Sequence, residues 1–132
     1  MADATPNDRP NTLPPLDEKG FPYDTTWVSI LQFFVKESDQ PAFEQDMESM
    51  YELAKKQPGY IWAHYGRSMI DGRWFVISEW ESYEQMKAWE HEPTHDQLGD
   101  AWKPRYDHGR DMQNRKLIPW YRPDKPKKAW TK

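Results

Sequence analysis

Prolines at the two ends of the chain decide where it can fold. Residues 1–24 contain five prolines and few apolar side chains, and residues 123–132 combine proline with lysine. Proline has a fixed φ and no backbone N–H, so it is excluded from helix interiors and central strands. We therefore predict one domain over residues 25–122, preceded by a proline-rich arm at 1–24 and followed by a basic tail at 123–132.

The composition excludes several classes of protein. The 132 residues include no cysteine, which rules out a disulfide framework, a thiolate nucleophile and cysteine-ligated metal sites. The net charge of −4 argues against broad electrostatic capture of nucleic acid. No apolar run approaches the length of a membrane span, and the N-terminus does not resemble a secretory leader. We therefore expect a cytoplasmic protein without a membrane span.

The basic tail differs in charge from the rest of the chain. Residues 121–132 contain five Lys or Arg and one Asp. Such a segment is suited to an acidic surface. We expect the arm and the tail to lie across a partner subunit.

Four runs rich in aromatic and β-branched residues predict strands. They cover residues 27–35, 60–67, 74–80 and 115–120. The first run consists mostly of β-branched, aliphatic and aromatic residues and predicts a strand buried on both faces. Residues 70–73 form a turn signal, so the second and third strands should pair antiparallel. The last strand contains Pro119, which predicts an edge position.

Helical spacing of apolar residues appears twice between these strands. Ser38 or Asp39 can cap a helix that ends at Gln57-Pro58-Gly59. A second helix should follow the cap signal Glu81-Ser82 and run from Tyr83 to about Glu90, with a short further helix from Pro93.

The element order β-α-β-β-α-β is the ferredoxin-like arrangement of the α+β class. It is a four-stranded antiparallel sheet with the helices on one face. The other face is left bare. Rings such as Trp27, Trp62 or Tyr65 on it would give an exposed apolar patch larger than soluble monomers tolerate. We therefore predict a homodimer in which two sheets pack face to face.

Several short segments resemble the antibiotic biosynthesis monooxygenase (ABM) family of dimeric α/β barrels. The likeness covers about residues 27–120, and its motifs lie at residues 57–60, 73–82, 86–89 and 93–95. That family and its neighbours include cofactor-free quinone-forming monooxygenases, haem-degrading enzymes and polyketide cyclases. The resemblance favours a cofactor-independent monooxygenase acting on a flat aromatic or polycyclic compound. A non-redox cyclase or isomerase with a histidine base, and a haem-binding or non-catalytic interaction protein, are the alternatives.

Residues His91 to His95 match the zinc-hydrolase pattern H-E-x-x-H. That pattern requires both histidines on one face of a continuous helix. Pro93 interrupts any such helix because it removes a donor and clashes with the preceding turn. We therefore predict no metal site here.

His95 is the candidate catalytic residue. The resemblance implies a histidine at the mouth of a pocket between helices and sheet, used as a general base in cyclases and as an axial iron ligand in haem-degrading members. An imidazole suits either task because it titrates near neutral pH. A structural histidine with both ring nitrogens satisfied is the competing interpretation.

Aromatic side chains are the candidate substrate-binding residues. Rings that line a pocket can hold a flat ligand by stacking. Strand alternation places Trp62 and His64 on one face and Tyr65 on the other, and leaves open which face meets the helices. An aromatic core or dimer seam is the alternative use of these rings. The candidates are Trp62, Tyr65, Trp89, Trp102 and His64.

Overall fold

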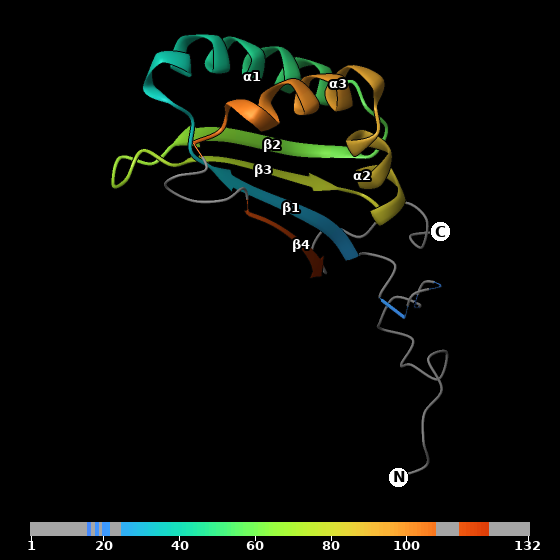
Figure 1. The fold of residues 1–132 in the computed structure, drawn as a ribbon. Helices are drawn as coiled ribbons and strands as arrows, with labels where there is room; N and C mark the ends of the chain where they lie inside the picture. The colour runs from blue at the N-terminus through green and yellow to red at the C-terminus, as the bar shows by residue number, and fades with distance from the viewer. Residues whose placement is uncertain (1–15, 17, 19, 22–24, 108–113, 122–132) are drawn as a thin grey trace.

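A computed structural model describes residues 16, 18, 20, 21, 25–107 and 114–121. Within these residues, four strands form one antiparallel sheet with the helices stacked on one of its faces (Figure 1). The basic tail and most of the proline-rich arm lie outside the described residues, as do their predicted contacts with a partner. None of the described helices is long and apolar enough to cross a membrane.

The architecture confirms the predicted ferredoxin-like α+β fold. The sheet order is β2-β3-β1-β4, which places Pro119 in an edge strand as predicted. The elements are β1 (Thr25–Phe33), α1 (Gln40–Ala54), β2 (Tyr60–Arg67), β3 (Trp74–Trp80), α2 (Tyr83–Glu90), α3 (Pro93–Trp102) and β4 (Asn114–Tyr121), with 3-10 turns at Glu37–Asp39 and Lys103–Arg105.

The core between helices and sheet is built around one ring. Phe43 of α1 lies 4.9 Å from the rings of both Trp74 and Trp102 and 5.2 Å from Phe33. These contacts are edge-on, which is a favoured geometry for aromatic pairs. Tyr106, which follows α3, closes the group at 4.7 Å from Phe33. We call these five residues the Phe43 cluster.

The sheet face away from the helices is largely apolar and is not covered by another element among the described residues. Its polar members are Thr26, Gln32, His64, Glu79 and Lys116. Strand alternation places Trp62, Phe75, Ile77, Val28, Ile30, Ile118 and Trp120 on it. Most are partly buried, whereas Trp120 is 52% exposed. Of the three rings predicted for this face only Trp62 lies there, because the pairing register turns Trp27 and Tyr65 towards the helices. Strand β1 has no exposed residue: its helix-facing side chains lie in the core, and on the other face Thr26 is buried while Val28 and Ile30 are partly buried.

The helix starts differ in how they are capped. Ser82 accepts a hydrogen bond from the Gln85 amide at 3.1 Å, as the sequence predicts for α2. Asp39 occupies the N-cap of α1 but makes no capping bond. Its carboxylate pairs with Arg105 at 2.8 Å instead, which ties the start of α1 to the turn after α3.

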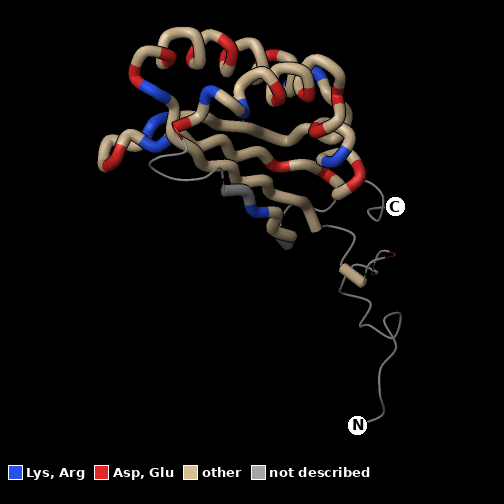
Figure 2. Tube along the Cα trace, in the orientation of Figure 1, with Lys and Arg blue, Asp and Glu red and all other residues tan. Residues whose placement is uncertain are grey.

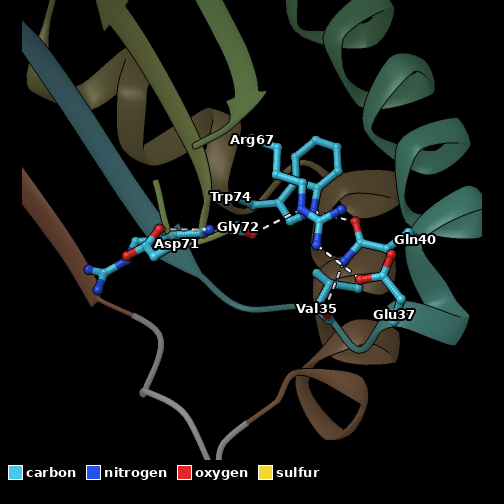
Figure 3. Close-up of polar contacts among 8 residues, drawn as sticks. Val35, Glu37, Gln40, Arg67, Asp71, Gly72 and Trp74 are labelled. Atoms are coloured by element: carbon cyan, nitrogen blue, oxygen red, sulfur yellow. Dashed lines mark hydrogen bonds and ion pairs between the residues drawn. The ribbon is translucent and has the colours of Figure 1, made fainter. Parts of the chain in front are cut away.

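A polar network joins the start of α1 to the β2–β3 hairpin (Figure 3). The Gln40 amide donates to the Val35 carbonyl and accepts from Trp74 Nε1, both at 2.8 Å. Beside it, Arg67 pairs with Glu37 at 3.1 Å on the surface. Gln40 therefore satisfies two protein groups that would otherwise lose their partners in the core.

We expect the Gln40→Ala variant to lower the free energy of unfolding by about 2 kcal/mol, because the indole N–H of buried Trp74 loses its hydrogen-bond acceptor. Chemical denaturation measures this loss. Glu37→Ala is the control: it removes only an exposed ion pair, worth about 0–1 kcal/mol. Equal losses in the two variants would contradict the role given to Gln40.

Candidate functional site

A cavity of about 250 Å³ lies between the helices and the covered face of the sheet. Its middle is lined by aliphatic and methionine side chains, which offer an apolar surface to a ligand. They are Leu31, Met47, Met50, Ala63, Val76, Met86 and Leu98. Rings of the Phe43 cluster border one end of the cavity, and Trp89 with His95 borders the other.

His95 owes its position to the break between α2 and α3. The break begins after Glu90, and Pro93 opens α3 as its first residue. The Glu92 carboxylate caps the new helix by accepting the amide hydrogens of Thr94 and His95, at 3.2 and 2.9 Å. The zinc pattern therefore spans the break: His91 is the C-cap of α2, Glu92 is the N-cap of α3, and only His95 lies within a helix. Among the described residues, no group of three or more His, Asp or Glu side chains is arranged to hold a metal ion.

The His95 ring is held in one orientation. Its Nδ1 lies 2.9 Å from the carbonyl oxygen of Trp89. A carbonyl only accepts, so Nδ1 carries the proton and Nε2 of the neutral ring has a free lone pair. The imidazole also stacks on the Trp89 indole, with centroids 4.2 Å apart and planes 11° apart. The structure therefore presents a histidine with one nitrogen fixed and the other available as a base.

Burial lowers the pKa of His95 below its ordinary value of 6.5. The hydrogen bond to Trp89 and the charges of Glu92 and Asp96 oppose this shift without cancelling it. The ring is therefore neutral at pH 7, which is the form that accepts a proton.

The cavity wall is acidic. Its described residues include four carboxylates, and Lys103 is the one Lys or Arg among them. Asp46 accepts from Trp102 Nε1 at 2.9 Å, and Glu90 pairs with Lys87 at 3.0 Å. Further acidic residues lie along α1, as the tube coloured by charge shows (Figure 2). The carboxylates of the wall are Asp46, Glu90, Asp96 and Asp100.

The structure brings most of the predicted site residues together. Tyr65, Trp89, Trp102 and His95 all line the cavity. Trp62 does not: it lies on the opposite sheet face, where its indole N–H donates to buried Glu79. His64 is counted in the lining along β2, but the pairing register places its side chain on the sheet face of Trp62, away from the helices. That side chain is exposed, and its ring lies 5.3 Å from that of Trp62.

Tyr106 is a cavity residue that sequence reasoning missed. Burial raises its pKa to about 12, so its hydroxyl stays protonated. It reaches the core because Val35, just beyond β1, forms an isolated bridge with it. No periodic pattern surrounds Tyr106, so its sequence neighbourhood gives no signal of burial.

Comparison with known proteins agrees with this fold. The family model described as "Antibiotic biosynthesis monooxygenase" matches residues 27–100. YqjZ, an uncharacterized protein of Bacillus subtilis strain 168, is 31% identical over 69 residues, which are 52% of this chain and 60% of that protein. The matched region therefore spans less than two thirds of that relative.

Solved structures share the fold at low sequence identity. A conserved protein from Methanosarcina mazei Go1 superposes with a TM-score of 0.66 at 11% identity, over 73% of this chain and 93% of that one. A mutant of SnoaB from Streptomyces nogalater, described as a cofactor-independent oxygenase, gives a TM-score of 0.59 at 16% identity, over 72% and 91%. At these identities the likeness establishes the fold alone.

The lowered pKa of His95 predicts a pH dependence of stability. As pH falls below about 6.5, the unfolded chain binds a proton at this ring before the folded one does, so the free energy of unfolding falls. Above that pH the contribution is constant. We expect His95→Asn, whose amide can still donate to Trp89, to flatten the slope between pH 5.5 and 7. Denaturation at several pH values tests this, with exposed His91→Asn as the control; an unchanged slope in His95→Asn contradicts it.

Proposed function

The chain belongs to the antibiotic biosynthesis monooxygenase family, and we propose that it is an enzyme that oxidises a flat phenolic compound without a cofactor, with His95 as the general base. The observation that carries the proposal is the His95 ring, which is held through Nδ1 by the Trp89 carbonyl and belongs to a residue that lines the cavity. The description of SnoaB as a cofactor-independent oxygenase supports the reaction type.

The chemistry requires a base and little else from the protein. His95 Nε2 takes the proton of a bound phenol, and the resulting phenolate is electron-rich enough to reduce O₂. One oxygen atom enters the ring and the other leaves as water, so a phenol and O₂ give a quinone and water. In this net change the substrate loses four electrons and O₂ gains them. The aliphatic and methionine side chains of the lining limit the access of water to the reacting anion.

The remaining cavity residues shape the substrate site. Tyr65 and Trp102 supply aromatic surfaces for a flat ligand, and the methionines adapt to its outline. The volume of about 250 Å³ lies near the lower limit of about 300 Å³ for small-molecule pockets. We therefore propose a compound of a few fused rings as the substrate.

The residues around the cavity do not fit haem. His95 Nε2 is of a type that binds iron, but the two propionates of a haem would meet four lining carboxylates and a single lysine. The cavity is also small for a porphyrin. We therefore assign no step to haem, and the proposed reaction needs no cofactor.

We expect His95→Asn to lower the rate of oxygen consumption by about 10²–10⁴-fold, the range for a lost general base. The assay is an oxygen electrode with 1-naphthol and a tricyclic anthrone as probes. His91→Asn is the control, because this histidine is exposed between the same two helices.

Two outcomes would contradict this function. If the probes are consumed without oxygen uptake, the reaction is not an oxygenation and the function is that of a non-redox cyclase or isomerase. If wild type and His95→Asn consume oxygen equally, His95 is not the base.

We propose that the functional unit is a homodimer formed through the uncovered sheet face. Ile77 lies in β3, next to Ile30 of β1 and His64 of β2, near the middle of this face. An apolar surface across four strands is suited to a second sheet packed against it. The partner that offers a matching surface is a second copy of the chain.

We expect sedimentation to give twice the chain mass of 15.9 kDa for the wild type at micromolar concentration. Ile77→Lys should shift the protein to the monomer because it buries a charge at the interface. Ile70→Lys is the control, since Ile70 is 96% exposed at the hairpin tip. A monomeric wild type would rule out the dimer.

A further inference from the structure

The indole of Trp89 lies against His95 rather than standing free as a platform for substrate. We propose that Trp89 is a positioning residue, which fixes the ring orientation and tautomer of His95. This inference rests on the proposed role of His95 as base. It differs from the sequence-based expectation, in which Trp89 binds substrate.

The stack restricts the rotation of the imidazole. The two rings lie 4.2 Å apart and within 11° of parallel. Rotation of the imidazole about its Cβ–Cγ bond would tilt it out of this contact. The same rotation would withdraw Nδ1 from the Trp89 carbonyl. A single residue therefore contacts His95 through its ring and through its backbone.

Pro93 leaves the Trp89 carbonyl available for this contact. In a continued helix that carbonyl would accept from the amide of residue 93, four positions later. Pro93 has no amide hydrogen. The carbonyl instead accepts from the Glu92 amide, at 3.2 Å, and from His95 Nδ1. Trp89, the last residue but one of α2, thus provides the acceptor that selects the tautomer of His95.

Trp89 is itself supported from the sheet. Trp80, which is fully buried in β3, stacks beneath it with centroids 5.9 Å apart and planes 24° apart. The Trp80 indole is anchored by a 2.9 Å hydrogen bond to Ser78. The rings of Trp80, Trp89 and His95 are therefore stacked in a row that runs from the sheet to the proposed base. We call this row the ring ladder.

The backbone of His95 is held separately from its ring. Its amide donates to the Glu92 carboxylate at 2.9 Å, a contact that does not involve the Trp89 indole. Loss of the indole should therefore release the imidazole while α3 keeps its start. This separation makes the inference testable without knowledge of the substrate.

The experiment is nitrogen NMR of protein labelled with ¹⁵N-histidine, which reports the tautomer of each imidazole at pH 7.5. The His95 signal is assigned by its absence from His95→Asn. We expect the wild type to show one tautomer at His95, with the proton on Nδ1. Trp89→Leu should lose this single tautomer and show a mixture of both, whereas Trp89→Phe, which keeps a ring, should retain it.

Trp27→Leu is the matched control. Trp27 is a partly buried tryptophan whose ring packs on Tyr83 of α2 at 5.1 Å instead of on His95. This variant should keep the wild-type tautomer, which separates the stack from a general loosening of α2. If Trp89→Leu does not fold, Trp89→Met replaces it, with the same expected mixture.

A single Nδ1–H tautomer in Trp89→Leu or Trp89→Met would overturn the inference, whatever the protein catalyses. So would a mixture in the wild type. Oxygen uptake that does not depend on His95 would instead remove the proposed function and leave the positioning of the ring intact. The two proposals therefore fail on different measurements.

Discussion

Two groups of aromatic rings, one at each end of the sheet, hold the helices on it, and the site depends on both. The Phe43 cluster joins α1, α3 and the strands at the end of the sheet where Phe33 pairs with Trp74. The ring ladder joins α2 and α3 to the other end, through Trp80. Most of the other side chains that line the cavity are aliphatic or methionine, and Tyr51 and Tyr65 border it from α1 and β2. Large rings at the ends and smaller side chains in the middle leave this space.

The same arrangement separates the two faces of the sheet by function. The covered face carries the cavity and His95, whereas the other face carries an apolar surface suited to a second sheet. A buried carboxylate, Glu79, accepts hydrogen bonds from Thr26 and Trp62 on this second face. It links three adjacent strands, so a polar group within an apolar surface also helps to fix its shape.

Local sequence signals predicted the elements well. Strand β3 and helix α2 have the predicted bounds, and Pro93 opens α3. Strand β1 ends two residues earlier than predicted, where Val35 leaves the strand to bridge Tyr106. It also begins two residues earlier, because Thr25 and Thr26 pair with β4. The N-cap of α1 is at a predicted position, Asp39, but its carboxylate pairs with Arg105 and makes no capping hydrogen bond to the helix. In both cases the competing partner lies more than 60 residues away, beyond the reach of local patterns.

The sequence by itself determined the helix break at Pro93, the placement of His95 just after it and the succession of strands and helices along the chain. These follow from a missing amide hydrogen and from local periodicity, which act over a few residues. Only the tertiary structure decided that Tyr65 lines the cavity while Trp62 faces away, and that Trp89 stacks on His95. Alternation defines two faces of β2 but is symmetrical between them. The choice depends on the pairing of β2 with β3, including the irregularity between Tyr60 and Trp62, and on which face the helices cover.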